Sequence, residues 1–424
     1  MIDEFRKRIQ PAGLIALLMI VFWLAPARAE NWPRWRGPDG NAVSAAAKLP
    51  TQWSRERNVH WKTAIPGEGT SSPIVWNDRI FLTSAQDDGT QRIVHCLDRA
   101  TGTIAWSRTI DDPNPEIASS LTGHAAATPV TDGTRVVAMF GNAGCVCYDF
   151  DGGKQWHRKF GEFESELGFA SSPIIVGGSV VLVCDHDGSR FRSFDSFLIA
   201  LDLKTGETRW KTERPGLFRS WSTPILVPAE NERRELIVAA QDEVRGYDPR
   251  TGRSLWAIAG MTGWVAPSPV FGDGLIFATS GREGPVMALR PGGRNDATAS
   301  HIAWQVRRGA PYVCSPLLYR GVLYVHNEQG ILTGFAAKSG ALLFRERMDG
   351  KFTASGIAGD GKVYLMNEGG ETFVLRAGRT FELVARNRLD EEVCASPAVA
   401  GGNLLVRTAS HLYCIGGRND EARR

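Results

Sequence analysis

The sequence predicts an all-β fold: an eight-bladed β-propeller of four-stranded antiparallel blades, closed by an N-terminal strand that pairs into the last blade. Three observations predict it. A Ser/Thr-Pro step opens an apolar run at intervals of about 40 to 56 residues, the spacing of propeller blades. An Asp-x-x-x-Gly turn recurs ahead of a tryptophan. The eighth repeat lacks that tryptophan, and "NVHWKT" supplies one before the first repeat.

The step marks the innermost strand of each blade. The steps are Ser72-Pro73, Thr128-Pro129, Ser172-Pro173, Thr223-Pro224, Ser268-Pro269, Ser315-Pro316 and Ser396-Pro397, with Ser355-Gly356 in the remaining repeat. After the first step we expect strands at 74–76 and 79–83, joined by a tight Asn77-Asp78 turn. In "ALDLKTGETRW" the third strand is expected at 198–201 and the fourth from 208, around the turn at 204–206.

The repeated tryptophans are expected to dock each blade on the next. They are Trp61, Trp106, Trp156, Trp210, Trp256 and Trp304, with Phe344 and then Leu383 or Val384 in the same place later in the chain. Each indole would bury ~200 Å² or more, which stabilises the contact by several kcal/mol. Trp61 is expected in the last blade, so that the ring has no open edge.

The propeller is predicted at 53–416, and the two ends of the chain are expected to lie outside it. Residues 1–29 predict a signal peptide, with Arg6, Lys7 and Arg8 before an apolar run and Ala27-Arg28-Ala29 as the cleavage site. An uncleaved anchor is the alternative, but the run has about 14 residues where spanning needs about 20. Residues 30–52 are read as an N-terminal arm and 417–424 as a charged tail. We expect a periplasmic or secreted protein with no lipid anchor and no transmembrane span after cleavage.

Charge and cysteine usage narrow the functional classes. A formal net charge of +3 over 424 residues argues against nucleic-acid binding. The seven cysteines include Cys96, Cys147 and Cys414, which stand two residues before the turn aspartate or in the matching place, where Ala200 and Gly246 stand elsewhere. That position favours a small side chain, so we expect packing rather than disulfides. No haem-attachment or paired zinc-ligand motif occurs.

These repeats resemble the pyrroloquinoline-quinone (PQQ)-like propeller repeat, whose docking signature reads A-x-D-x-x-x-G-x-x-x-W. "ALDLKTGETRW" matches it in full, and "CLDRATGTIAW" and "GYDPRTGRSLW" match with a small first residue. The resemblance spans about Trp53 to Ile415. It implies one of two activities, because the family contains quinoprotein dehydrogenases and also cofactor-free scaffold proteins of the BamB type. "NWPRWRGPDG" at 31–40 also looks like the N-terminal region of secreted bacterial propellers.

Two departures from the dehydrogenase pattern bear on the cofactor. Those enzymes hold the quinone against a disulfide of adjacent cysteines and coordinate calcium with carboxylate and amide groups; this chain has no adjacent cysteines and no matching Glu/Asn/Asp set. "CDHDGSRFRSFD" at 184–195 places Asp185, His186 and Asp187 together, but consecutive residues of an extended chain point in alternating directions. We therefore expect no metal site.

The candidate binding site is a rim at the mouth of the axial channel. The loops on one face are irregular, at 107–126 and 185–195, and function concentrates on such loops. Just before the steps stand five aromatics with a histidine and an arginine: Phe169, Trp221, Trp264, Tyr312, Phe352, His124 and Arg219. They either plug the channel as core or form a stacking surface for a flat ligand or a groove for a peptide.

Two functions follow from these observations. The first is an exported, non-catalytic scaffold that binds a protein, peptide or glycan through this rim, without a cofactor. The alternative is a PQQ- and calcium-dependent oxidoreductase of alcohols or sugars, with an aspartate base near His124 or Asp185. No nucleophile elbow, P-loop or H-E-x-x-H motif occurs.

Overall fold

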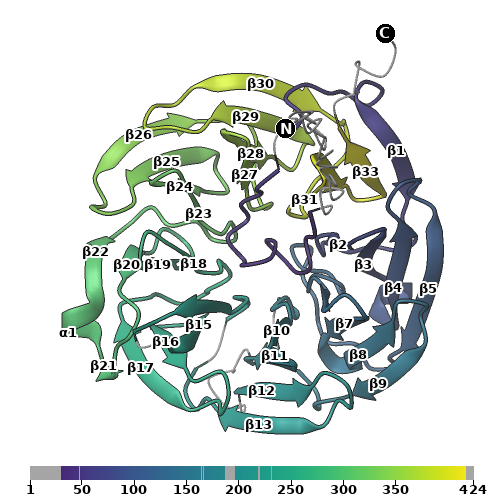
Figure 1. The fold of residues 1–424 in the computed structure, drawn as a ribbon, viewed down its shortest axis with the longest axis horizontal. Helices are drawn as coiled ribbons and strands as arrows, with labels where there is room; N and C mark the ends of the chain where they lie inside the picture. The colour runs from purple at the N-terminus through teal and green to yellow at the C-terminus, as the bar shows by residue number, and fades with distance from the viewer. Residues whose placement is uncertain are drawn as a thin grey trace, which may run out of the picture.

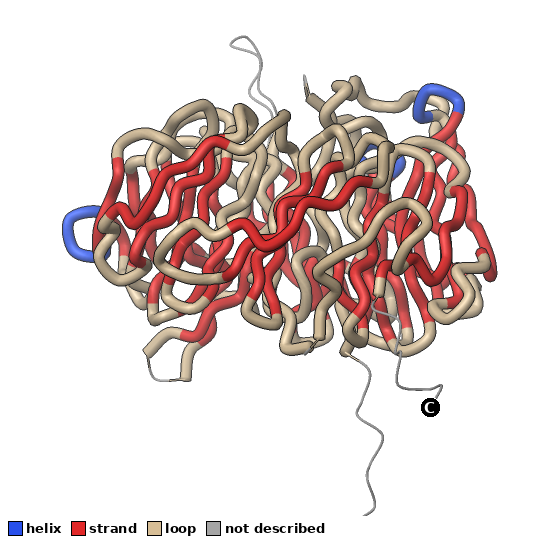
Figure 2. The backbone as a smooth tube through the Cα atoms, turned by 90° about the horizontal axis from the view of Figure 1, so that it is seen from above, coloured by secondary structure: helices blue, strands red, loops and turns tan. Residues whose placement is uncertain are grey.

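The computed structural model is a ring of eight antiparallel β-sheets around a central axis (Figure 1). It describes residues 30–46, 48–163, 165, 167–186, 196–217, 220–230 and 232–416. Figure 2 shows the ring edge-on, with strands crossing its thickness and loops along its two faces. The predicted eight-bladed propeller is confirmed.

The first four blades follow the chain in order. Blade 1 consists of β2 (Ile74–Trp76), β3 (Arg79–Gln86), β4 (Gln91–Asp98) and β5 (Ile104–Asp111), with η1 (Asp87–Gly89) between β3 and β4. Blade 2 consists of β6 (Val130–Thr131), β7 (Arg135–Phe140), β8 (Gly144–Asp149) and β9 (Lys154–Arg158), with η2 (Gly141–Ala143). Blade 3 consists of β10 (Ile174–Val176), β11 (Ser179–Cys184), β12 (Phe197–Asp202) and β13 (Thr208–Glu213). Blade 4 consists of β14 (Ile225–Pro228), β15 (Arg234–Ala239), β16 (Glu243–Tyr247) and β17 (Ser254–Ala259).

The last four blades repeat this plan with one insertion. Blade 5 consists of β18 (Val270–Gly272), β19 (Leu275–Thr279), β20 (Val286–Leu289) and β22 (Ile302–Val306), with β21 (Asn295–Asp296) and α1 (Thr298–His301) inserted. Blade 6 consists of β23 (Leu317–Tyr319), β24 (Val322–His326), β25 (Ile331–Ala336) and β26 (Leu342–Arg347). Blade 7 consists of β27 (Ile357–Gly359), β28 (Lys362–Met366), β29 (Glu371–Arg376) and β30 (Leu383–Arg388). Blade 8 consists of β31 (Ala398–Ala400), β32 (Asn403–Arg407), β33 (His411–Ile415) and β1 (Val59–Ala64).

The N-terminal strand closes the ring, as predicted. β1 pairs antiparallel with β33, and Trp61 lies opposite Cys414. The Trp61 indole nitrogen then donates to the carbonyl of Arg99 in blade 1 at 3.0 Å. Because the first and last segments share one sheet, neither end of the repeat array leaves an unpaired inner edge.

Tryptophan docking uses the same turn of each following blade. The indole N–H groups of Trp106, Trp156, Trp210 and Trp304 donate to carbonyl oxygens of Phe150, Leu203, Pro249 and Ala337 at 2.8–3.3 Å. The turn glycine supplies the surface on which the ring rests: a Cβ on Gly206 would lie 2.7 Å from the Trp156 ring. Glycine is therefore needed at this place for contact as well as for its φ of +73°.

Small residues beneath the indoles explain the distribution of cysteine. Cys96, Cys147 and Cys414 each lie directly opposite a docking tryptophan across the strand pair. Gly246 does the same for Trp256, and a Cβ there would approach the ring to 2.3 Å. All seven cysteines lie within the described part of the chain and are unpaired. The packing role of Cys96, Cys147 and Cys414 follows from their position opposite the indoles.

The junction of blades 4 and 5 departs from the pattern. The insertion between β20 and β22 takes the place of the usual turn, and β21 pairs in parallel with β17. Trp256 therefore donates at 2.9 Å to the buried carboxylate of Glu235, which also accepts the N–H of Gly292. The sequence repeat gave no sign of this fifth strand on blade 4.

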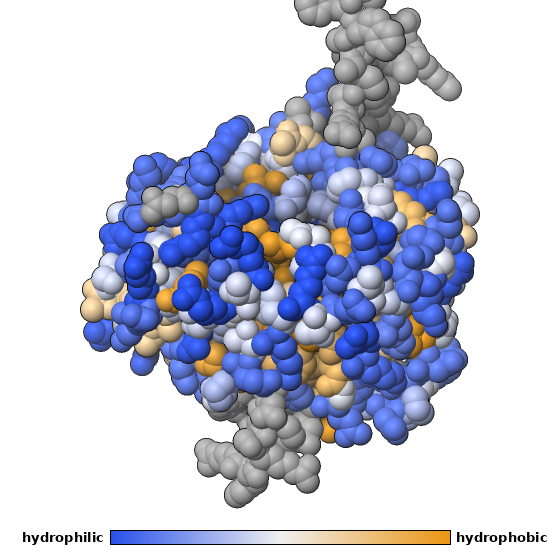
Figure 3. Space-filling view, turned by 60° about the horizontal axis from the view of Figure 1, so that its bottom comes forward, coloured by the Kyte–Doolittle hydropathy of each residue, from blue (hydrophilic) through white to orange (hydrophobic). Residues whose placement is uncertain are grey.

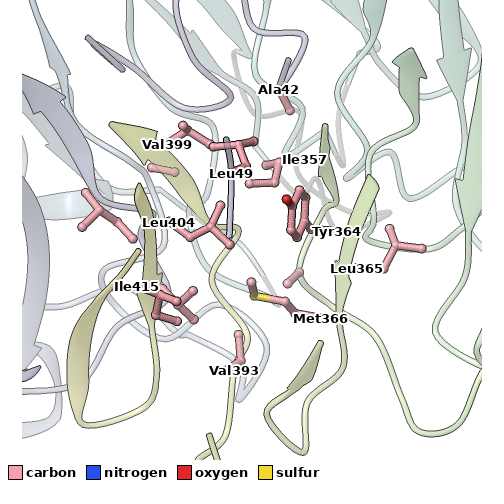
Figure 4. Packing of buried hydrophobic residues seen from close by; sticks show 14 of the residues in the cluster. Ala42, Leu49, Ile357, Tyr364, Leu365, Met366, Val393, Val399, Leu404 and Ile415 are labelled. Atoms are coloured by element: carbon pink, nitrogen blue, oxygen red, sulfur yellow. The ribbon is translucent and has the colours of Figure 1, made fainter. Parts of the chain in front are cut away.

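The N-terminal arm crosses one end of the axial channel (Figure 1). It exchanges hydrogen bonds with blades 1, 2, 5, 6 and 7, through Trp32 with Val75, Pro33 with Thr131, Asn41 with Phe271, Arg36 with Pro316, and Ala42 and Ser44 with Ala358. Figure 4 shows the arm residues Ala42 and Leu49 among buried side chains of blades 7 and 8. The arm thus ties together blades that are distant in sequence.

The exterior is mainly polar. On the side drawn in Figure 3, hydrophobic residues show mainly in recesses among hydrophilic ones. No helix among the described residues is long and apolar enough to cross a membrane. The predicted signal peptide at 1–29 and tail at 417–424 lie outside the described residues, and so does most of the loop at 185–195.

Candidate functional site

The wall of the axial channel is built by the segments that lead into the innermost strands. Side chains alternate in direction along an extended chain, so every second residue faces the axis. One set stands at the predicted steps, and we call it the hydroxyl ring. It consists of Ser72, Thr128, Ser172, Thr223, Ser268, Ser315, Ser355 and Ser396.

The hydroxyl ring connects neighbouring blades by a repeated hydrogen bond. Seven times, the backbone N–H of one member donates to the hydroxyl of the next member at 2.7–3.0 Å. Where blade 8 meets blade 1, Arg407 instead donates through Nη1 to the carbonyl and hydroxyl oxygens of Ser71, at 2.9 and 2.7 Å. These groups are buried, so each hydrogen bond satisfies a backbone N–H that would otherwise lack a partner.

A second ring stands two residues before each step, and we call it the entrance ring. It consists of Thr70, Ala126, Ala170, Trp221, Ala266, Val313, Thr353 and Cys394, and all eight line the axial cavity. Seven of these side chains are small, which leaves the centre open. The cavity measures about 130 Å³, and about 840 Å³ when the open space at its mouth is included.

The arm forms the floor of this cavity. Trp35 lines it together with six members of the hydroxyl ring, while Leu121, Thr122 and Leu167 line it from the interblade crossings. The arm binds the face of the short inner turns, where Asn77 donates its backbone N–H to Asn31 at 2.7 Å. The site is therefore a cup with its floor at the arm and its mouth on the irregular loop face.

Three neighbouring aromatic residues stand at one side of the cup, where Trp221 and Tyr312 line it and Trp264 packs against both. The rings of Trp221 and Trp264 stack at 5.9 Å and 16°, and Tyr312 meets Trp264 edge-on at 6.5 Å. The Trp221 indole donates to the carbonyl of Gly168 at 2.7 Å, which holds its ring in place. The Arg282 guanidinium lies 5.4 Å from the Trp264 ring and 5.0 Å from the Tyr312 ring. The result is a rigid flat ledge with a cation beside it.

Trp264 also has an unusual backbone. Its φ is +67°, in the left-handed region that bulky residues rarely adopt. Such a conformation costs about 1–3 kcal/mol and persists only where neighbouring contacts hold it. Here the next residue, Val265, accepts the backbone N–H of Trp221 at 2.9 Å, so the crossings of blades 4 and 5 position both indoles.

The other predicted rim residues lie elsewhere. Phe352 is fully buried and packs against His326 and Phe373, and Phe169 is 8% exposed and packs against Phe163. Both stand three residues before their steps, but this offset alone does not decide the direction of a side chain, because Tyr312 has the same offset and lines the cavity. Arg219 lies outside the described residues. Sequence reasoning missed the entrance ring, which the alternation around each step could have indicated.

His124 belongs to a buried ionic cluster instead of the cup. Its backbone carbonyl accepts from Arg92 at 2.7 Å, and its Nδ1 lies 3.9 Å from Glu116. Glu116 is held by Arg92 at 2.9 Å and by the backbone N–H of Asn142 at 3.0 Å. Burial, and then the charge of Arg92, lowers the pKa of His124. None of these residues lines the cavity.

Asp185 is likewise engaged in structure. Its two oxygens accept from Arg214 at 2.8 and 2.9 Å in a buried bidentate pair, and Arg214 also donates to the Tyr247 hydroxyl. Burial raises the pKa of Asp185. His186 stacks on Phe163 at 4.9 Å, and Asp187 lies outside the described residues. Asp185 is thus paired with a buried arginine, and so is Glu116 beside His124.

The lining does not fit the quinone and calcium of the dehydrogenases. Those groups need carboxylate and amide ligands, whereas the described lining consists of hydroxyl, aromatic and aliphatic side chains and one thiol. Within the described ranges no three His, Cys, Asp or Glu side chains converge to hold a metal ion. We therefore derive no chemical step through this cofactor.

The closed ring, the repeated docking tryptophans and the axial cup define a PQQ-like β-propeller. A family profile described as outer membrane protein assembly factor BamB matches residues 51–212 and 240–380. These matches cover more than half of the chain, so the chain belongs to this family.

Individual relatives differ in their reported roles. Outer membrane protein assembly factor BamB of Yersinia pestis is 22% identical over 299 residues, which are 66% of this chain and 71% of that protein. Serine/threonine-protein kinase AfsK of Streptomyces griseus is 29% identical over 237 residues, which are 52% of this chain and only 26% of the kinase. The chain is thus similar to proteins of different function.

Solved structures share the fold at low sequence identity. BamB from Moraxella catarrhalis has a TM-score of 0.60 and 13% identity, covering 85% of this chain and 98% of that chain. A europium-containing methanol dehydrogenase has a TM-score of 0.56 and 10% identity, covering 90% of each chain. At these identities the likeness shows the fold alone.

Proposed function

We propose that this chain is an exported, non-catalytic binding protein whose partner enters the axial cup from the loop face. The observation that carries the proposal is the chemistry of the cup. Its described lining is uncharged, closed at the floor by Trp35 and bordered on one side by Trp221, which stacks on Trp264. Such a surface recognises shape and hydrogen bonds without supplying charge.

The same lining argues against covalent catalysis. A serine or threonine hydroxyl becomes a nucleophile when an adjacent base removes its proton. The hydroxyl ring instead accepts backbone N–H groups, and no histidine or carboxylate shares the described lining. Asp185, which the sequence suggested, is held by Arg214, and Glu116 beside His124 is held by Arg92.

Export and a scaffold role rest on the sequence and on the relatives. Residues 1–29 have the charge, apolar run and cleavage pattern of a signal peptide. The relative from Yersinia pestis is named an assembly factor of outer membrane proteins, a role that needs binding and no reaction. Peptide sequencing of the secreted product should give Glu30 as its first residue.

The decisive experiment compares ligand binding with cofactor binding in the purified chain. Libraries of short peptides and oligosaccharides are titrated while the fluorescence of the indoles is recorded, in parallel with PQQ plus Ca²⁺ and a dye-linked alcohol assay. We expect saturable quenching by library members. Ala266→Trp, which fills the cup, should weaken binding at least tenfold, and the exposed Ala105→Trp on β5 should leave it unchanged.

Two results would overturn the proposal. One is a saturable PQQ spectrum accompanied by dye reduction that Ala266→Trp abolishes. The other is equal binding by the wild-type protein and by folded Ala266→Trp, because the partner would then not occupy the cup.

A further inference from the structure

We infer that the occupant of the cup is the end of a neutral sugar chain, bound with one sugar ring stacked on the Trp221–Trp264 ledge and its hydroxyl or acetamido oxygens facing the hydroxyl ring. The inference rests on the proposed function, since it names the ligand class of the same cup. Four features of the described lining support it.

The first feature is the absence of charge in the described lining. Its side chains are hydroxyl, aliphatic and aromatic, with Cys394 as the one thiol. Burial raises the pKa of Cys394 to about 11, so this group is neutral as well. A charged ligand group placed inside the cup, away from Arg282 beside Tyr312, would lose water without gaining a counter-ion, which is costly. The lining therefore selects neutral, polar ligands.

The second feature is the direction of the hydroxyl hydrogens. Ser172, Thr223, Ser355 and Ser396 each accept a backbone N–H through their oxygen. Within the described chain none of their hydroxyl hydrogens has a protein acceptor, and all four residues line the cavity. The ring consequently offers several converging O–H donors. A ligand rich in acceptor oxygens, as a sugar is, complements it.

The third feature is the aromatic ledge. Trp221 lines the cup and stacks face to face on Trp264, with an interplanar angle of 16°. One face of a pyranose ring presents C–H groups, which pack on the electron-rich face of an indole. The left-handed backbone of Trp264, with φ of +67°, indicates that this orientation is maintained at an energetic cost.

The fourth feature is that the cup has a floor. This closed end favours sugars over peptides as ligands. Trp35 lines the inner end, so a chain that enters lengthwise must bring its terminus inside. A peptide terminus carries a charged amine or carboxylate, whereas the end of a neutral oligosaccharide carries only uncharged groups, which are hydroxyls and, in N-acetylated sugars, acetamido groups. The uncharged lining thus favours the sugar over the peptide.

Cys394 provides a native reporter for the test. It is half-buried and lines the cup, whereas the other six cysteines are buried. Alkylation of Cys394 by iodoacetamide is followed by mass spectrometry in the full chain, with and without each probe. The probes are neutral β-linked gluco- and N-acetylgluco-oligosaccharides of two to six rings, oligogalacturonates, and peptides of matching length with free or blocked ends.

We expect neutral oligosaccharides to slow alkylation at least tenfold at saturation, with no protection by oligogalacturonates or peptides. Trp264→Ala should lower the affinity for the protecting oligosaccharide at least tenfold while leaving the alkylation rate of the free protein unchanged. Ala105→Trp, on the outer strand β5, serves as the control that retains full protection.

The outcomes separate this inference from the proposed function. Protection by peptides and not by sugars overturns the sugar inference and leaves a binding protein. Protection by oligogalacturonates as strong as by neutral sugars overturns the argument from charge. Failure of the whole neutral panel to protect Cys394 overturns the inference, and binding of PQQ with dye reduction overturns the proposed function too.

Discussion

The hydroxyl ring allows the free energy of unfolding of a Ser172 variant to be predicted. Its hydroxyl accepts the backbone N–H of Thr128 at 2.9 Å, and the two residues are 4% and 2% exposed. Ser172→Ala removes one oxygen atom and creates little empty space, so the cavity contribution is small. The main effect is a buried N–H without its acceptor, which costs about 1–3 kcal/mol.

The assay is equilibrium unfolding in urea, with the slope of the transition compared between variants. Ser172→Thr keeps the hydroxyl, and the hydroxyl ring already contains threonine at Thr128 and Thr223. This variant should therefore lower the free energy of unfolding by less than about 0.5 kcal/mol. Ser254→Ala, exposed on β17, controls for loss of a hydroxyl alone. If Ser172→Ala and Ser254→Ala proved equally stable, a water in the cup would be replacing the hydroxyl and the reasoning would be refuted.

Three further predictions concern docking, pH and thiol reactivity. Gly206→Ala forces a Cβ to 2.7 Å from the Trp156 ring at a φ of +73°, and should lower the free energy of unfolding by more than the ~1–2 kcal/mol of left-handed strain alone. Burial, and then the charge of Arg407, lowers the pKa of His95 to about 4, and burial lowers that of His326 to about 4. The unfolded chain, whose histidines titrate near 6.5, binds more protons between these values, so stability should fall from pH 6.5 to 4 by up to about 3 kcal/mol per histidine, measured as the urea midpoint against pH. In native protein, iodoacetamide should modify Cys394 alone, whereas urea should expose all seven thiols.

Each of these predictions has a matched comparison. Gly178→Ala carries a similar φ of +75° but has its nearest neighbour at 3.9 Å, so it isolates backbone strain from the clash. Equal losses at Gly178 and Gly206 would exclude a docking role for the glycine. A pH profile unchanged by His326→Asn would show that this histidine does not supply the slope. Modification of a second thiol in the native state would contradict the packing of the cysteines.

The repeat in the sequence was sufficient to predict the ring because docking is a local and repeated contact. Trp106 and Trp156 contact the next blade through the turn that follows one repeat later, so spacing along the chain translates directly into geometry. Trp61 was identified as the missing member by the same count. Trp256 shows the limit, because the insertion before β22 replaced its partner turn and only coordinates reveal Glu235 as the substitute.

The cup was less predictable, since it depends on which side of an extended chain faces the axis. The aromatics aligned by sequence stand two, three or four residues before their steps, and this offset does not sort them. Trp221 and Tyr312 line the cavity at offsets of two and three, whereas Phe352, also at three, lies in the core. The floor was less predictable still. Trp35 reaches the channel through arm contacts with five blades, which no local pattern encodes.

By itself, the sequence determined the number of blades, the closing strand and the residues that dock one blade on the next, because these contacts recur at a constant spacing. Only the tertiary structure decided that the channel is a cup with a floor, that hydroxyls and small side chains line it, and that Glu116 and Asp185 are each held by an arginine. Those properties arise where eight distant segments and the arm converge on one axis, and convergence of that kind leaves no periodic trace in the chain.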